Sequence, residues 1–409
     1  MRLLWLDFKL AYRNIARQKR RSMIAIGAVT FGISALILAN GFIAWIFLDF
    51  RESLINSQLG HLQITRPGYL EAGKADPYAF LLPKAIPELE KPGESEPIKT
   101  IAPRLSFSGL ISHGESTISF IGEGVSPQEQ AAFGNAVQIS AGQNLSAEHP
   151  SGIIVGEGLA RNLGVKVGDK VILLATTASR GTNAVEVTVR GLFSTVTKSY
   201  DDAAIRVPME TARRLLRTEG SHVWAVLLYD TAETDTMLAE LRARLKNDDL
   251  EIVPWYALAD FYNKTVDLFS KQIHGVRIII AVIILLSITN TMTMNVMERI
   301  GEIGTSLALG VKRMGIMRLF LAEGILIGSA GGLLGLALGL LLSGVISNIG
   351  IPMPPPPGMA RGYTGEILVT PDIALQSLAL AISTTLAASI YPAWRASRMN
   401  IVDALRHNR

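Results

Sequence analysis

Four long segments of the chain are apolar and free of charge, and no other feature of the sequence restricts the possible folds as much. The first covers residues 23–48, and the others lie within 278–297, 324–350 and 373–394. A bilayer core of about 30 Å requires roughly 20 apolar residues in each helix. Buried helices of soluble proteins rarely run this long without a charged residue. The sequence therefore predicts four transmembrane helices.

The composition indicates a membrane protein with a sizeable soluble part. Of the 409 residues, 49% are hydrophobic and only 18% are charged, whereas about a quarter of the residues are charged in soluble proteins. The chain has no cysteine, which excludes disulfides, thiolate zinc sites, a cysteine nucleophile and lipidation of the chain itself.

The basic residues flank the apolar segments. The chain has 39 Lys/Arg and 35 Asp/Glu; residues 50–275 hold 22 and 27 of these, which leaves 17 and 8 elsewhere. This distribution indicates membrane topology and argues against nucleic-acid binding. Because cytoplasmic segments are enriched in Lys and Arg, we expect both termini and residues 298–318 in the cytoplasm, and residues 50–275 outside. The first span is about twice as long as a signal-peptide core and lacks a small-x-small cleavage site, which predicts a retained anchor.

The predicted fold is an integral membrane α-helical protein with four transmembrane helices and a large mixed α/β extracytoplasmic domain between helices one and two. In chain order we expect a cytoplasmic amphipathic helix, span one, an external domain of two subdomains, span two, a cytoplasmic segment, span three, an external proline-rich loop, span four and a cytoplasmic tail. Their bounds are 1–21, 22–49, 50–275, 276–297, 298–317, 318–348, 349–371, 372–394 and 395–409.

The external domain shows both strand and helix patterns. Strands are expected at 153–155, 170–174 and 185–189 from β-branched and alternating residues. Helices are expected at 158–163, which Gly164 closes, at 211–217 and at 236–246. Prolines mark an irregular stretch from Pro83 to Pro97, and a break between subdomains is expected within 100–150.

The sequence offers no recognisable catalytic or metal-binding set. The six histidines are dispersed, and the adjacent carboxylates Asp201 and Asp202 are expected in a solvated turn. The G-x-S-x-G elbow and the phosphate-binding G-x-x-x-x-G-K-S/T loop are both missing. We therefore expect a chain that is no enzyme and binds no cofactor or metal itself, so that another subunit must bind any ATP and Mg²⁺.

Residues 297–314 have the periodicity of an amphipathic helix. Apolar residues at spacings of 3, 4, 4 and 3 predict one stripe: Ile300, Ile303, Leu307, Val311 and Met314. Charged residues lie mostly off it: Glu298, Arg299, Glu302, Lys312 and Arg313. Such a helix can lie in the membrane interface or offer an apolar contact to a cytoplasmic partner, and a plain inter-helix loop is the simpler alternative. The N-terminal residues 2–20 also place aromatic residues on one face, which suits a helix on the inner leaflet.

Glycines recur every four residues in the third span, at Gly331, Gly335 and Gly339. Small residues at this spacing let two helices approach closely in lipid. The partner can be another span of the same chain or a second subunit. Glu323, at the start of this span, is expected to be an interfacial residue and not a proton carrier.

The order of these segments resembles the FtsX-like permeases, the type VII ABC transporter subunits that include the macrolide exporter MacB and the lipoprotein-releasing permeases LolC and LolE. Residues 298–310, E-R-I-G-E-I-G-T-S-L-A-L-G, are similar to the family's E-R-x-x-E-I-G-x-x-x-A-x-G. The stretches 14–21, 155–171 and 392–405 also resemble family motifs, although Ile401 stands where the family usually has proline. The size and Gly60-His-Leu-Gln-Ile64 resemble the lipoprotein-releasing branch, which has a separate ATPase.

The resemblance implies a role and partners. It implies a permease in the bacterial inner membrane that works as a dimer, with a second copy or a paralogue, above a dimer of cytoplasmic ABC ATPases. ATP-driven closure would reach the external domains, which act on a lipoprotein, or on a peptide or drug with a periplasmic adaptor. The ATPase would contact the segment after span two, at Glu298, Arg299, Ile300, Glu302, Ile303, Leu307, Ala308, Gly310, Val311 and Met314.

Two functions of other classes stay open from the residues alone. A membrane-anchored enzyme would need a clustered nucleophile and base, which the residue inventory does not offer. A scaffold or sensor would bind outside without transport, and it would not co-purify with an ATPase.

Overall fold

A computed structural model describes residues 2–73, 76–83, 97–126, 137–146, 149–195, 197–245, 249–354 and 363–400. The chain forms two compact units. The helical unit comprises Met1–Phe47, Thr265–Pro352 and Thr364–Arg409, and the mixed unit comprises Leu48–Lys264 and Met353–Tyr363. Residues 84–96 of the proline-rich stretch, residues 355–362 of the loop at 349–371 and the tail motif beyond residue 400 lie outside the described residues.

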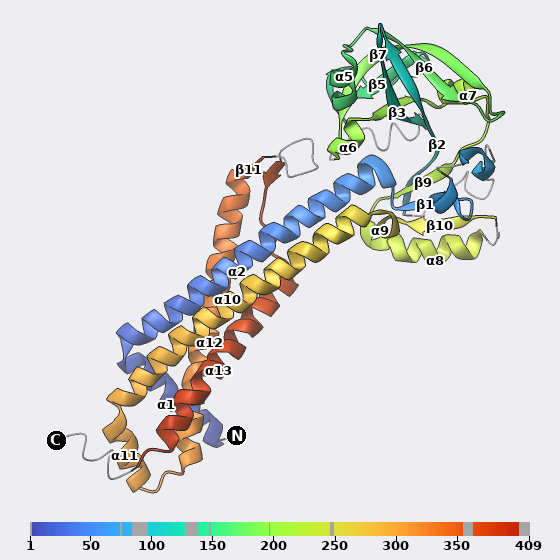
Figure 1. Ribbon diagram of the computed structural model, residues 1–409. Helices are drawn as coiled ribbons and strands as arrows, with labels where there is room; N and C mark the ends of the chain where they lie inside the picture. Colours follow the sequence, from blue (N-terminus) through green and yellow to red (C-terminus); the bar gives the residue numbers. More distant parts are fainter. Residues whose placement is uncertain are drawn as a thin grey trace. The chain divides into compact units, whose positions relative to one another are not determined.

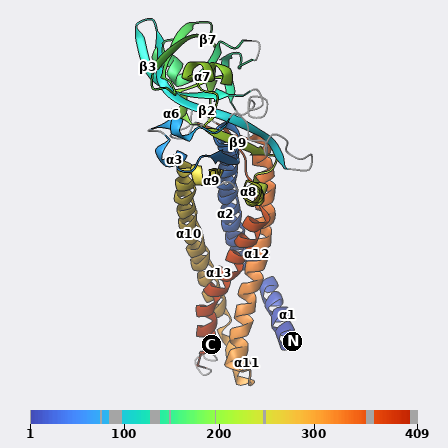
Figure 2. The ribbon, with the colours of Figure 1, turned by 90° about the vertical axis from the view of Figure 1, so that its right-hand side faces the viewer.

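Four long helices make up most of the helical unit, and they run side by side in two views (Figures 1 and 2). They are α2 (Lys19–Leu54), α10 (Asp260–Glu298), α12 (Arg313–Ile349) and α13 (Pro371–Ser397). Each is long and apolar enough to cross a bilayer. The four predicted spans fall within these four helices, which confirms the predicted helix type and order.

Two shorter helices, α1 (Arg2–Arg17) and α11 (Ile300–Ala308), lie at one end of the helical unit (Figure 1). Thr370 caps α13 by accepting a hydrogen bond from the Ile373 N–H at 3.3 Å, with Pro371 at the first helical position, where its missing N–H costs nothing. A small sheet pairs β11 (Ile351–Met353) with β12 (Tyr363–Gly365).

The mixed unit is built on one ten-stranded sheet with helices packed on it. The strand order is β10-β1-β9-β2-β3-β8-β5-β7-β4, and β6 pairs with β2 and β7. The strands are β1 (Leu62–Thr65), β2 (Ile98–His113), β3 (Ser116–Val125), β4 (Gln138–Gly142), β5 (Gly152–Gly156), β6 (Lys170–Thr176), β7 (Thr182–Ser194), β8 (Ala204–Pro208), β9 (Val223–Leu228) and β10 (Glu251–Pro254). The helices are α3 (Tyr69–Ala72), α5 (Glu157–Leu163), α6 (Lys198–Asp201), α7 (Met209–Leu216), α8 (Thr234–Arg244) and α9 (Trp255–Leu258), with a π-helical turn at Ile55–Leu59 and 3-10 turns at Pro77–Phe80 and Thr231–Glu233.

Two apolar cores divide the mixed unit into lobes. The larger lobe packs α5 and α7 on strands β3 and β5 to β8 and on the second half of β2. The smaller lobe packs α8 on β1, β9, β10 and the start of β2. The chain therefore leaves the smaller lobe along β2 and returns to it at β9. Every strand and helix predicted within 153–246 is present, and Gly164 ends α5 in the left-handed conformation with φ of 74°.

Asp201 differs from the prediction of a solvated turn. Its side chain is buried and accepts hydrogen bonds from the Thr195 N–H, the Thr195 hydroxyl and the Ser194 hydroxyl. Burial raises the pKa of this carboxyl, and the hydrogen bonds oppose the rise. Asp201 thus ties α6 to the end of β7, a structural role that its neighbour Asp202 does not share.

Candidate coupling site at one end of the helical unit

The segment after α10 is two helices and not one. α11 ends at Ala308, Gly310 has φ of 92°, and α12 begins at Arg313. An L-residue with a side chain rarely adopts this φ, so Gly310 permits the turn. The prediction of a single helical stripe from Ile300 to Met314 is therefore wrong, because the spacing of apolar residues continues across a turn.

The first part of the predicted stripe faces the chain itself. Ile300 and Ile303 are buried, at 8% and 4% exposure. Ile303 packs with α10, α12 and α13 in a cluster of Val296, Ile316, Phe320, Ala393 and Ala396, and Leu307 packs half-buried against it. These contacts fix α11 to the long helices, and Ile300 and Ile303 are too buried to contact a partner.

The second part of the stripe is exposed at the turn. Leu309 is 81% exposed, Val311 44% and Met314 62%. Ala308 and Gly310 are exposed as well, and Lys312 and Arg313 follow them. We call residues 308–314 the apolar tip. Exposed apolar side chains that cluster together are typical of contact surfaces, whereas single exposed apolar residues are ordinary.

A network of charged side chains ties α11 to α1 and α12, and the end of α10 to α2. Arg299 bonds Glu302 at 3.1 Å and Glu323 at 2.9 Å. Glu323 also accepts from the Asn14 amide at 2.7 Å. Glu302 pairs with Arg17, and Glu298 pairs with Arg21. The hydrogen bond from Arg17 holds the pKa of the Glu302 carboxyl below its usual value.

The centre of this network is nearly dry. The Glu323 side chain is 3% exposed and that of Arg299 is 12% exposed, and the Arg299 guanidinium also lies 5.7 Å from the Phe320 ring centroid. Buried charges of this kind need a partner, because removing one leaves the other uncompensated. Glu323 is therefore a buried ion-pair partner of Arg299, and its position at the membrane interface stays a prediction.

The partners Asn14, Arg17 and Arg21 were not predicted as site residues. They belong to the N-terminal stretch that resembles the family's entry into the first span. The sequence contained one usable signal: a carboxylate at position 323 inside an apolar run requires a cation. Four basic residues precede it within residues 298–318, and only the structure shows that Arg299 is its partner.

The glycines of α12 lie against α2. A Cβ on Gly331 would lie 2.6 Å from Val29 Cβ, one on Gly335 2.8 Å from Ile33 Cβ, and one on Gly339 3.2 Å from Ile37 Cβ. The Thr30 hydroxyl also donates to the Gly331 carbonyl at 3.2 Å. These glycines pack within the chain, which answers the open question about their partner.

A second row of glycines on α12 packs on another helix. Gly324 and Gly328 lie directly against Ser389 and Thr385 of α13, and Gly332 lies against Ala381. The two rows make α12 the helix that joins α2 and α13, and α10 adds a hydrogen bond from Thr289 to the Ala388 carbonyl. Because these helices are tightly packed, a displacement of α11 would be passed on to all of them.

In the mixed unit, the residues that follow α2 are anchored by a chain of hydrogen bonds. His61 Nδ1 accepts from the Leu228 N–H at 3.0 Å, so Nε2 donates to the Thr231 hydroxyl at 3.0 Å. That hydroxyl donates to Glu52 at 3.0 Å. The last turns of α2 are thereby tied to the smaller lobe, and burial lowers the pKa of His61 to about 4.

These features define a class: a membrane protein of four spans, with a large mixed α/β unit inserted after the first span. Residues 22–244 match the family model of the MacB-like periplasmic core domain, and residues 276–401 match that of the FtsX-like permease C-terminal region. The chain therefore belongs to the FtsX-like permeases of ABC transporters, the family of MacB, LolC and LolE.

Curated relatives agree with this assignment. A lipoprotein-releasing system transmembrane protein LolC of Neisseria meningitidis is 23% identical over 94% of each chain. A LolC of Xylella fastidiosa is 28% identical over 62% of this chain and 64% of its own length. A macrolide export ATP-binding/permease protein MacB of Hyphomonas neptunium is 27% identical over 51% of this chain and 31% of its own length.

Among solved structures, the periplasmic region of MacB from Actinobacillus actinomycetemcomitans matches 54% of this chain and 98% of its own, with 14% identity and a TM-score of 0.37. The extracellular domain of the transporter YknZ matches 47% of this chain and 98% of its own, with 10% identity and a TM-score of 0.34.

Proposed function

We propose that this permease transmits ATP-driven movement from a separate cytoplasmic ABC ATPase to its mixed α/β unit, which releases a lipoprotein from the outer face of the inner membrane. The family membership and the LolC relative that aligns over 94% of each chain support this proposal. Efflux of a peptide or drug with a periplasmic partner is the alternative, favoured by the similarity to a MacB. The positive-inside rule supports a cytoplasmic position for both termini and α11 in this proposal.

The proposal rests mainly on one observation: α11 ends in an exposed apolar surface, while the rest of the helix is held firmly by the chain. The apolar tip is exposed, while the rest of α11 is fixed by buried isoleucines and by the Arg299–Glu323 pair. A contact on the tip would therefore act on α11 as a rigid body. α11 packs on α10, α12 and α13, and the residue ranges of α2 and α10 continue into the mixed unit.

The ATPase would bind this surface through the tip and the charged rim. In this assignment Leu309, Val311 and Met314 supply the apolar contact, with Ala308 and Gly310 beside them. Ile300, Ile303, Leu307 and the charged residues Glu298, Arg299 and Glu302 position the tip from within the chain. A second permease copy or paralogue completes the assembly, and ATP and Mg²⁺ are bound by the ATPase.

The test is a charge placed on the tip. Leu309→Asp and Met314→Asp should abolish co-purification with the partner ABC ATPase, because burying an unpaired charge and losing an apolar contact cost several kcal/mol. That corresponds to a loss of about a hundredfold or more in affinity. Leu110→Asp, at an exposed leucine of β2 in the mixed unit, is the matched control and should keep the ATPase.

The exposed position of Leu309 makes the result interpretable. A folded Leu309→Asp permease that retains its ATPase at the yield of the unmodified chain contradicts the assignment of the tip. The same change at half-buried Leu307 would disturb the chain's own packing and is the weaker test.

A further inference from the structure

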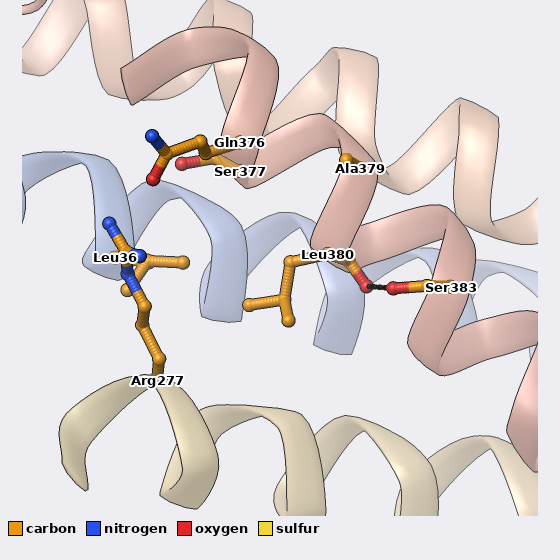
Figure 3. A pocket seen from close by; sticks show the side chains of 7 residues that line it. All are labelled: Leu36, Arg277, Gln376, Ser377, Ala379, Leu380 and Ser383. Carbon is orange, nitrogen blue, oxygen red and sulfur yellow. Dashed lines mark hydrogen bonds between the residues drawn. The ribbon is translucent and has the colours of Figure 1, made fainter. Parts of the chain in front are cut away.

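A cavity of about 370 Å³ opens between α2, α10 and α13 in the helical unit (Figure 3). Its lining residues are Leu36, Arg277, Gln376, Ser377, Ala379, Leu380 and Ser383. It lies apart from the apolar tip and the charged network, and the coupling function does not use it. Leucine and alanine side chains form its walls, and one cation lies at its edge.

Two polar groups of the cavity lack partners within the described part of the chain. No described carboxylate or carbonyl pairs with the Arg277 guanidinium. The Ser377 side chain is 1% exposed, and its hydroxyl makes no hydrogen bond. By contrast, Gln376 donates to Asp372 at 2.7 Å and Ser383 donates to the Leu380 carbonyl at 3.1 Å. A buried hydroxyl without a partner loses its hydration without compensation, which points to a ligand.

The position of Arg277 limits what this ligand can be. Arg277 directly precedes the uncharged run from Ile278 on α10, so it lies where a span meets the headgroup region. Figure 3 shows its side chain extending from α10 toward Gln376 and Ser377, with Leu36 and Leu380 beside it. A ligand with an anionic group and an aliphatic chain would fit this cavity. The anion would pair with the guanidinium, and the chain would cover the leucine side chains.

We propose that this cavity binds a glycerophospholipid of the surrounding leaflet. Arg277 pairs with the phosphate, the Ser377 hydroxyl donates to a phosphate or ester oxygen, and one acyl chain lies along Leu36 and Leu380. A planar guanidinium is well suited to phosphate because it can donate two parallel hydrogen bonds. The inference needs only that α2, α10 and α13 cross a bilayer, so it stands apart from ATPase coupling and from the nature of the cargo.

The experiment uses the full chain in lipid nanodiscs that contain phosphatidylglycerol with a photoactivatable acyl chain. After illumination, mass spectrometry should find the lipid attached within residues 376–383. Arg277→Gln should reduce this attachment by about tenfold, the effect of losing a charge-assisted hydrogen bond. Ala379→Trp, at an exposed position on the rim, should reduce it by filling the cavity.

The matched control is Lys271→Gln, which removes a positive charge from the same helix at an exposed residue paired with Asp267. It should leave attachment within residues 376–383 unchanged. Two competitors without phosphate, a diacylglycerol and a triacylated lipopeptide, should displace the probe poorly. Equal attachment in Arg277→Gln and the unmodified chain, or displacement by either competitor as effective as by unlabelled phosphatidylglycerol, would overturn the proposal.

Discussion

At the scale of single residues, the Arg299–Glu323 pair is the most consequential contact of the candidate coupling site. The segment after α10 and the start of α12 meet through it, with both side chains nearly excluded from water. Charges in such a place are retained at a desolvation cost, and they are weak evidence for stability. Their role here is to fix the position of α11 on the long helices.

Breaking this pair should destabilise the helical unit. Arg299→Met is expected to lower the free energy of unfolding by about 3–5 kcal/mol, because Glu323 is left buried without a cation. Thermal unfolding in detergent measures the effect. Lys170→Met, which breaks an exposed pair of similar length with Glu186, should leave thermal unfolding nearly unchanged, because solvent screens an exposed ion pair. The double change Arg299→Met and Glu323→Leu should recover part of the loss, and no recovery would show that the pair is not the cause.

The two buried histidines of the mixed unit predict a stability that depends on pH. Burial lowers the pKa of His61 and of His222 to about 4, from 6.5 in the unfolded chain. Between pH 6.5 and 4 the unfolded chain therefore binds more protons, so stability is present above pH 6.5 and is lost as the pH falls toward 4. The slope is up to about 1.4 kcal/mol per pH unit for each histidine.

Unfolding of the full chain followed between pH 6.5 and 5 tests this, since most carboxylates titrate below that range. His61→Gln, which can still hydrogen-bond, should remove one histidine's share of the slope. A slope identical to that of the unmodified chain would mean that His61 is not the titrating group.

At the scale of elements, α12 is the central helix because its two glycine rows contact α2 and α13. Gly335→Ala should destabilise the helical unit by about 1–3 kcal/mol, since the new methyl would lie 2.8 Å from Ile33 Cβ and 2.9 Å from the Thr30 carbonyl. Gly344→Ala on the same helix meets nothing within 4 Å, so it should be neutral or stabilising. Unfolding in detergent compares the two, and equal effects would refute close packing at Gly335.

The elements also show how far the sequence can predict this fold. Long apolar runs and strong local patterns identify the spans and the strands within 153–189, because each depends on neighbours in sequence. The division into lobes was only placed within 100–150, since β2 shares its length between two cores and pairs with β9 more than a hundred residues away. Such pairings leave no local pattern.

The coupling segment was predicted in part for a related reason. Its amphipathic residues were recognised by their spacing, but periodicity cannot reveal that Gly310 turns the backbone between Ile303 and Met314. Residues on one predicted face thus divide into a buried group and an exposed group. The polar partners of Glu323 are Asn14 of α1 and Arg299, which directly precedes α11, and only the three-dimensional structure brings them together.

At the scale of the whole molecule, the orientation in the membrane can be tested with single cysteines, because the chain has none of its own. Ser116→Cys in the mixed unit and Thr305→Cys in α11 are both at exposed positions. An impermeant maleimide should label Cys at position 116 in intact spheroplasts, and should label position 305 only after permeabilisation. Labelling of position 305 alone would reverse the proposed topology.

We expect ATP binding by the ATPase, which contacts the α11 end, to move the mixed unit. The most direct measurement is the distance between spin labels at Ser116→Cys and Thr305→Cys in one chain, with the ATPase bound and ATP either absent or trapped. We expect the distance distribution to shift when ATP is trapped, and to stay fixed when Leu309→Asp is added. An unchanged distribution in the otherwise unmodified complex, while its ATPase hydrolyses ATP, would contradict the account.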